Sequence, residues 1–193
     1  MKKQSEILLS ILNRYKVIIA TTVLSALLVL GFVLIFAQSR DSKAYAVAGA
    51  QIDELSQNII KHYRVMPSYW GLSTTEVINK KLYPDSMNVK DGKLVGFFAN
   101  RVEVGADENG STVMPGIKSF VITYNNISKN QCIELGSHKY NEEFWLNVSK
   151  IVIKNADTEQ EFIWGDEKYG LIPNKKMLKD LCKNNSNKLL VYF

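Results

Sequence analysis

The sequence predicts an α+β fold in which a long N-terminal α-helix, transmembrane and then amphipathic, packs on an antiparallel β-sheet. Three observations predict it. Residues 17–37 form an apolar run of 21 residues without one charged side chain. Apolar residues then recur at helical spacing up to residue 63. Beyond residue 100, short segments rich in β-branched and aromatic residues alternate with turn and capping signals, as in a domain of strands and short helices.

The apolar run is long enough to cross a bilayer as a helix. At ~1.5 Å per residue, its length matches the ~30 Å hydrocarbon core. A cleaved signal peptide usually has a shorter apolar core, about 7–15 residues, that ends in a small-x-small cleavage site. Here the run is followed by Gln38-Ser39-Arg40-Asp41. We therefore expect residues 17–37 to be a transmembrane helix that acts as an uncleaved signal anchor.

The distribution of basic residues predicts the orientation of this helix. Four lysines and arginines lie within residues 2–16, whereas only Arg40 and Lys43 follow the run closely. The positive-inside bias places residues 1–16 in the cytoplasm as a basic flank, and residues 38–193 outside. The net charge is +5, but basic and acidic residues are mixed along the chain. This mixing argues against specific nucleic-acid binding, which favours a basic block.

The helix is predicted to continue beyond the membrane. Residues 38–63 contain no proline and a single glycine, Gly49. An apolar stripe recurs at spacings of three and four residues and consists of Ala48, Ile52, Leu55, Ile59 and Tyr63. One helix from about residue 15 to about residue 63 follows, and residues 38–63 are its amphipathic part. The stripe is expected to pack against the globular domain formed by residues 64–193.

Short helices in the globular domain are predicted from capping signals. Ser73 and Glu76 form a capping box at the start of a helix over 74–81, and Ser128 and Gln131 form another before a helix that carries Cys132. Asn174 caps a helix over 175–182. Strands are predicted at 101–104, 117–124, 148–153, 161–164 and 189–193, and a turn at 83–86.

The two cysteines, Cys132 and Cys182, both lie in the predicted outer domain. Neither has a second cysteine nearby, so a CxxC metal or redox motif is absent from the sequence. Two thiols in an oxidising compartment favour a structural disulfide. The alternative is two separate buried thiols.

Residues that could support catalysis are few. His62 and His138 are the only histidines, and each is expected at the surface. The acidic pairs Glu142-Glu143 and Asp166-Glu167 lie in polar stretches typical of solvated loops. No nucleophile elbow, phosphate loop or dinucleotide fingerprint is present in the sequence. We therefore expect a protein that is not an enzyme, with no cofactor and no metal.

An aromatic loop follows Pro67. Its residues Tyr69 and Trp70 either pack the loop on its own domain or form a contact site for another protein.

The order of these features resembles the type IVb pilins, the family that includes bundle-forming, toxin-coregulated and conjugative thin-pilus subunits. A membrane helix continues as an amphipathic helix to Tyr63. The later matching features, in chain order, are Tyr69-Trp70-Gly71-Leu72, Pro84–Met87, strand 117–124, the helix with Cys132, strand 148–153, the helix with Cys182, and the final strand 188–193. The resemblance implies a pilin-like fold and a bridge between Cys132 and Cys182. It also implies a role in pili or fimbriae, which serve secretion, cell adhesion or conjugation.

The front end of the chain departs from this family. Type IV prepilins carry a basic leader that ends in Gly, and Glu occupies the fifth mature position inside the apolar segment. In this sequence no Gly directly precedes the apolar run, and no acidic residue lies between Ile7 and Ala37. We therefore expect Met1–Lys16 to be retained.

Two hypotheses follow from the resemblance and the departure. The first is a structural subunit of a type IV pilus or pilus-like machine, which assembles with like subunits through its apolar helix. The second is an uncleaved single-pass inner-membrane component whose pilin-like periplasmic domain docks to or primes a pilus or secretion assembly. Both place the chain in the bacterial inner membrane and in an oligomer. An assembled subunit would also reach an extracellular pilus.

Overall fold

The structure is a computed structural model that describes residues 2–66, 68–107, 119–140, 148–163, 173–183 and 186–193. In the first helix, it describes the side chains of Tyr15, of residues 22–32 and of residues from 42 onward. The chain divides into two compact units, Met1–Lys43 and Ala44–Phe193.

The first element, α1, is one α-helix over Lys2–Tyr63. It ends at Tyr63, as the apolar stripe predicts, but it begins well before the predicted start near residue 15. Residues 2–14 contain neither proline nor glycine, so the sequence offers no helix breaker before the apolar run.

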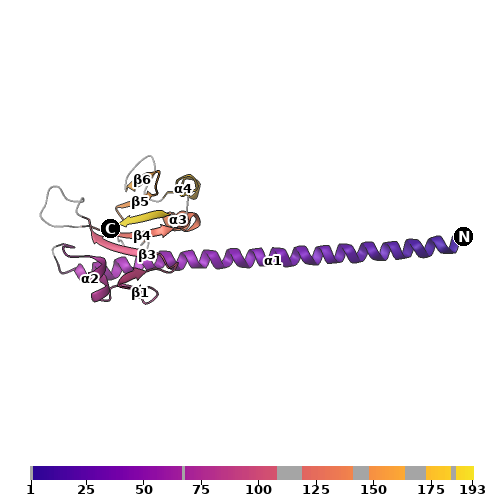
Figure 1. The fold of residues 1–193 in the computed structure, drawn as a ribbon, viewed down its shortest axis with the longest axis horizontal. Coiled ribbons are helices and arrows are strands. Elements are labelled where there is room, and N and C mark those ends of the chain that lie inside the picture. The colour runs from indigo at the N-terminus through magenta and orange to yellow at the C-terminus, as the bar shows by residue number, and fades with distance from the viewer. Residues whose placement is uncertain (1, 67, 108–118, 141–147, 164–172, 184–185) are drawn as a thin grey trace. The chain divides into compact units, whose positions relative to one another are not determined.

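The Ala44–Phe193 unit contains the other helices and an antiparallel sheet (Figure 1). In chain order, the elements are α2 (Thr74–Asn79), β1 (Asn88–Lys90), β2 (Lys93–Val95), β3 (Arg101–Ala106), β4 (Phe120–Ile127), α3 (Lys129–Gly136), β5 (Lys150–Lys154), β6 (Glu159–Ile163), α4 (Lys175–Leu181) and β7 (Asn187–Tyr192). The strand order within the described residues is β1-β2-β3-β4-β7-β5-β6. The last strand, yellow in Figure 1, therefore pairs with β4 on one side and β5 on the other.

The three predicted helix caps are confirmed. Ser73 Oγ accepts a hydrogen bond from the Glu76 N–H. Ser128 and Gln131 cap each other's backbone N–H reciprocally, which is the full capping box. Asn174 Oδ1 accepts from the Met177 N–H. These polar side chains satisfy N–H groups that the first turn of a helix leaves without partners.

The predicted strands over 101–104, 117–124, 148–153, 161–164 and 189–193 correspond to β3, β4, β5, β6 and β7, with boundaries that differ by up to three residues. Residues 117, 118 and 164 lie outside the described residues.

The hairpin of β1 and β2 is a feature that the sequence analysis did not predict. Lys90 pairs with Lys93 across the two-residue turn Asp91-Gly92. Both turn residues have positive φ, 52° and 69°, which is typical of the type I′ turn. An Asp-Gly pair is a strong hairpin signal, but the strands beside it are polar and short, so their periodicity is weak.

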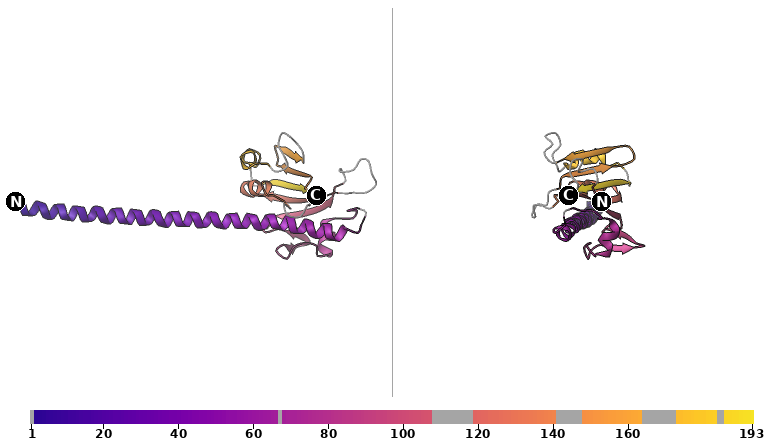
Figure 2. Two further views of the ribbon diagram at one scale, coloured as in Figure 1. Left: turned by 180° about the vertical axis from the view of Figure 1, so that it is seen from behind. Right: turned by 90° about the vertical axis from the view of Figure 1, so that its left-hand side faces the viewer.

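One face of the sheet carries the core. A row of paired, buried apolar residues crosses four strands, from Ile122 to Val191, Ile151 and Phe162. Their neighbours along each strand point to the opposite face, because side chains alternate in a strand. Figure 2 shows this sheet from two further sides. The sheet is therefore covered by helices on one face, as in other two-layer α+β folds.

The second half of α1 belongs to this core. All five residues of the predicted stripe, Ala48, Ile52, Leu55, Ile59 and Tyr63, are buried. The polar residue Gln51 is buried among them, and the nitrogen and oxygen of its side-chain amide bond different segments. Its Nε2 donates to Ser86 O at 2.7 Å, and its Oε1 accepts from Phe97 N at 2.9 Å. Gln51 thus fixes the segments on either side of the β1–β2 hairpin to the helix.

The sequence predicts a surface histidine at 138, and the structure places His138 in a half-buried position. Its Nε2 lies 3.0 Å from Asp53 Oδ2 on α1, and its ring packs edge-on against Tyr140. Gly49 makes this position available, since a Cβ at residue 49 would lie only 2.6 Å from the His138 ring. The single glycine of the amphipathic segment is therefore a site of close approach between α1 and the loop after α3.

Candidate functional site

An exposed apolar helix surface is the first candidate. In residues 22–32 of α1, seven large apolar side chains are more than half exposed: Val23, Leu24, Leu27, Leu28, Val29, Leu30 and Phe32. They occupy positions 23, 24, 27–30 and 32, and so surround the helix rather than forming a stripe. A helix that is apolar on all sides is stable only when it is covered by lipid or by other helices.

The structure does not assign a membrane span. Within the part of the chain that it describes, no helix combines the length and the hydropathy needed to cross a bilayer. The structure does not describe the side chains of residues 17–21 and 33–37, which belong to the predicted span. The transmembrane assignment therefore stays a prediction from the sequence.

The predicted disulfide is confirmed. Cys132 in the first turns of α3 and Cys182 at the C-cap of α4 are bonded, with their Cα atoms 5.9 Å apart. Both residues are fully buried. The bridge joins α3, which packs on the sheet, to α4, which packs on α3, and it closes a segment that contains β5 and β6.

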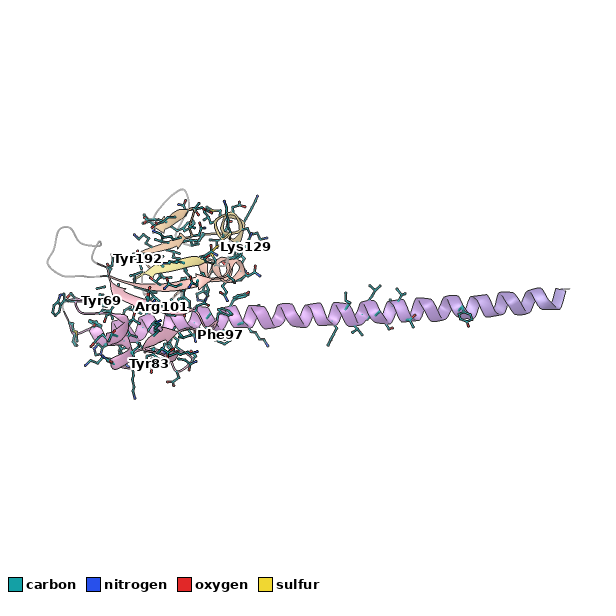
Figure 3. All side chains as sticks on the ribbon, in the orientation of Figure 1. Tyr69, Tyr83, Phe97, Arg101, Lys129 and Tyr192 are labelled. Carbon is teal, nitrogen blue, oxygen red and sulfur yellow. A yellow bond between two sulfur atoms is a disulfide. The ribbon has the colours of Figure 1, made fainter. Side chains whose placement is uncertain are left out.

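The two residues of the aromatic loop have different surroundings. The Tyr69 ring lies 5.4 Å from that of Tyr63 and 4.8 Å from that of Phe120, and burial raises the pKa of its hydroxyl. Trp70 is 80 % exposed. The backbone turns here: Leu72 N donates to Tyr69 O, and Gly71 has φ 80°. Because of this turn, the side chains of Tyr69 and Trp70 point in different directions. Tyr69, labelled in Figure 3, therefore packs the loop on its domain, and Trp70 is presented to solvent.

Trp70 is one of three exposed apolar residues near the end of α1. Val65 is 90 % exposed and Met66 is 45 % exposed. We call Val65, Met66 and Trp70 the loop surface. Exposed tryptophan and methionine are enriched where proteins contact other proteins. Tyr69 thus follows the packing alternative, and a contact role stays a prediction for Trp70 alone.

The described residues contain no constellation typical of catalysis or metal binding. Within the ranges given above, no group of three or more histidine, cysteine and acidic residues is placed to hold a metal ion. The His62 ring contacts the ring of Tyr63, whereas His138 contacts Asp53. Glu142-Glu143 and Asp166-Glu167 lie outside the described residues.

Two buried tyrosines are the most perturbed titratable groups among those described. Burial raises the pKa of Tyr124 strongly. It also raises the pKa of Tyr140 well above the ordinary value, and the nearby negative charge of Asp53 adds to this effect. Both are buried in the core, and Tyr140 Oη donates to the backbone oxygen of Leu135 at 2.7 Å. Their perturbation therefore reflects packing rather than a reactive site.

Comparison with known proteins gives a consistent family. Residues 42–162 match the family model described as PilS N terminal. The fold is similar to the crystal structure of the type IV b pilin from Salmonella typhi, with a TM-score of 0.54 and 16 % identity, over 76 % of this chain and 97 % of that one. It is also similar to TcpA, a type IV pilin from Vibrio cholerae El Tor biotype, with a TM-score of 0.54 and 12 % identity, over 78 % and 99 % of the two chains. No curated protein sequence matches.

Proposed function

Because this chain belongs to the PilS family of type IVb pilins, we propose that it is a structural subunit of a type IV pilus or pilus-like machine that assembles through its N-terminal apolar helix. The observation that carries the proposal is the exposed apolar surface of residues 22–32. This surface needs a cover, and a lipid bilayer or the helices of like subunits would provide one. The proposed location is the inner membrane before assembly and the pilus after it.

The two halves of α1 have different surroundings, which supports this proposal. The stripe from Ala48 to Tyr63 is buried in the globular unit and is not available for other contacts. The large apolar side chains of residues 22–32 are exposed. A helix can therefore exchange lipid for neighbouring subunits along its first half without disturbing the domain that its second half stabilises.

A charged substitution in the apolar surface tests the proposal. Leu27→Lys places a charge where Leu27 is 63 % exposed, and a lysine at the centre of a membrane helix costs about 3 kcal/mol. We expect the variant to be lost from membranes and from sheared filament fractions, while the thermal unfolding of the globular unit is unchanged. Val89→Lys, at a 38 % exposed position on β1, is the matched control and is expected to assemble normally. Normal membrane insertion and assembly of Leu27→Lys would contradict the proposal.

The loop surface is a candidate for lateral contacts between assembled subunits. Because Trp70 is exposed and makes few contacts within its own domain, Trp70→Ala should leave the melting temperature within about 2 °C of the wild type. If Trp70 is an anchor between subunits, its loss weakens association by about 2 kcal/mol or more. Filament yield from cells expressing each protein measures the effect. The matched control is Phe97→Ala, which removes another exposed aromatic side chain.

One observation favours the second hypothesis, an anchored component that docks to or primes the machine. No acidic residue lies between Ile7 and Ala37, so these residues do not offer the carboxylate that pilins of this family place in the apolar segment. The intact mass of the protein isolated from native membranes separates the two hypotheses. A mass that includes Met1–Lys16 supports the anchored component, whereas a shorter mass with a methylated new N-terminus supports the filament subunit.

A further inference from the structure

A pocket of about 430 Å³ lies beside the last turns of α1 and the turn that ends α2. Its lining residues are Asn58, Lys61, His62, Lys81 and Leu82. Tyr83, which follows Leu82, is labelled in Figure 3 and marks this turn. The pocket lies wholly within the Ala44–Phe193 unit, and the assembly proposed above does not use it.

The backbone at Lys81 is the first unusual feature of the pocket. The turn after α2 is a Schellman motif, in which Leu82 N donates to Val77 O and Lys81 N donates to Ile78 O. Lys81 has φ 54°, in the left-handed region. Glycine is usual at this position, because a side chain there costs about 1 kcal/mol. The sequence thus has a lysine where glycine would give the more stable turn.

The positive charge of the pocket is the second feature. Glu76 is paired with Lys80, at 4.0 Å, and not with Lys81. Among the ion pairs of the described residues, none includes Lys61, His62 or Lys81. The carboxyl ends of α1 and α2 lie beside the pocket and attract cations, but together they supply at most about one negative charge. The charge of the two lysines, Lys61 and Lys81, exceeds this amount.

We propose that this pocket binds a small multivalent oxyanion of the phosphate or sulfate class, either as a free ion or as the ester of a small molecule. Lys61 and Lys81 supply the charge from two different elements. Asn58 and His62 offer N–H donors that such an oxyanion accepts. Leu82 gives an apolar wall that suits the carbon atoms of an ester. Lys81, with its positive φ, places a cation at a turn position that glycine usually occupies.

The two histidines of the chain provide a direct measurement. In the full chain in non-ionic detergent with ¹³C-labelled histidine, each ring gives one set of NMR signals, and the variant His62→Asn assigns them. We expect inorganic phosphate to shift the His62 signals in a saturable manner, while His138, held against Asp53, stays unchanged. Sodium chloride at the same ionic strength should not reproduce the shift. Equal shifts of both histidines, or none, would overturn the proposal.

Variants separate a binding role of the lysines from a structural one. Lys81→Gly removes the charge and relieves the left-handed strain, so its melting temperature should equal or exceed that of the wild type. Its dissociation constant for phosphate should nevertheless rise about threefold to fivefold, the loss expected for one partly exposed ionic contact. Lys61→Gln should behave alike in binding. Lys93→Gln, at an exposed lysine on β2, is the charge-matched control and should bind as the wild type does.

Comparing two ligands, inorganic phosphate and glycerol 3-phosphate, shows whether the pocket binds the free ion or an ester. If glycerol 3-phosphate binds as tightly as inorganic phosphate or more tightly, the pocket takes esters, and if it binds more weakly, the pocket takes the free ion. Both results support an oxyanion pocket. Weakening by Lys93→Gln equal to that by Lys81→Gly would instead show that only the net charge of the protein matters, and would overturn it.

Discussion

At the scale of single residues, two buried tyrosines differ in one hydrogen bond. Tyr140 Oη donates to Leu135 O, whereas Tyr124 Oη is buried without a hydrogen-bond partner among the described residues. The same substitution should therefore have opposite effects. Tyr140→Phe removes one of the hydrogen bonds to Leu135 O, which keeps the His138 N–H as a donor at 3.2 Å, and should lower the free energy of unfolding by about 1 kcal/mol. Tyr124→Phe removes an unpaired hydroxyl and should raise it by about 1 kcal/mol. Urea unfolding of both variants measures this, and an equal loss for the two would contradict it.

Tyr124 also predicts how stability depends on alkaline pH. Burial raises its pKa in the folded state, while the unfolded chain has the ordinary value near 10. The folded chain therefore keeps a proton that the unfolded chain loses above about pH 10. This contribution to stability is complete below that pH and decreases as pH rises toward the folded pKa. Tyr124→Phe should make the decrease shallower by about 1.4 kcal/mol per pH unit between pH 10 and 11.5. Parallel curves for the two proteins would refute the prediction.

Gly49 is a position where two general effects oppose each other. Alanine in a helix interior is favoured over glycine by about 1 kcal/mol, but a Cβ at residue 49 would lie 2.6 Å from the His138 ring. The overpacking cost of about 1–3 kcal/mol should exceed that gain, so Gly49→Ala should destabilise the protein. In a His138→Ala background the obstacle is gone, and the same change should stabilise by about 1 kcal/mol. Thermal unfolding of the four proteins completes the double-mutant cycle.

At the scale of elements, the caps and the amphipathic stripe were predictable because each depends on neighbours within four residues. Ser128 and Gln131 satisfy each other locally, and the stripe follows from helical spacing alone. The position of β7 between β4 and β5 depends on pairing over long sequence separations, which periodicity does not encode. Gln51 lies three residues after Ala48 and four before Leu55, so its spacing could have placed it among the buried residues. Its partners, Ser86 and Phe97, could not be predicted from local sequence.

The candidate site was predictable to a similar degree. The apolar run and Trp70 can each be recognised in the sequence alone, and both are exposed where the structure describes them. The pocket beside Lys81 was not predicted, because Lys61 and His62 come from α1 whereas Lys81 comes from the turn after α2, where it has positive φ.

The disulfide between α3 and α4 gives a prediction at the element scale. The two cysteines are 50 residues apart, and closing such a loop stabilises by about 4 kcal/mol in the chain-entropy model. The double variant Cys132→Ala/Cys182→Ala should lose about this amount in urea unfolding. Adding reductant to the wild type during unfolding should give the same loss, and it should have no effect on the variant. A loss below about 1 kcal/mol would show that residual structure in the unfolded chain already holds α3 and α4 together.

At the scale of the whole molecule, the boundary between the two units falls within α1, after Lys43, and not at the end of the helix. The reason is that every residue of the stripe, from Ala48 to Tyr63, contributes to the core of the second unit. The second half of α1 is therefore part of the globular domain. The domain boundary predicted from the sequence, at residue 64, falls between the stripe and the sheet that the stripe covers.

This placement predicts which fragments fold. A fragment over 44–193 keeps the stripe and Gln51, so it should be soluble without detergent, form the Cys132–Cys182 bridge and unfold cooperatively by circular dichroism. A fragment over 64–193 has the same sheet and the same disulfide cysteines but lacks the stripe. Burying the four large side chains of the stripe, Ile52, Leu55, Ile59 and Tyr63, stabilises by roughly 2 kcal/mol each, which is comparable with the entire stability of a domain of this size. The shorter fragment should therefore show no cooperative transition. Cooperative unfolding of both fragments at the same temperature would mean that the sheet is stable without the helix and that α1 is only attached to it.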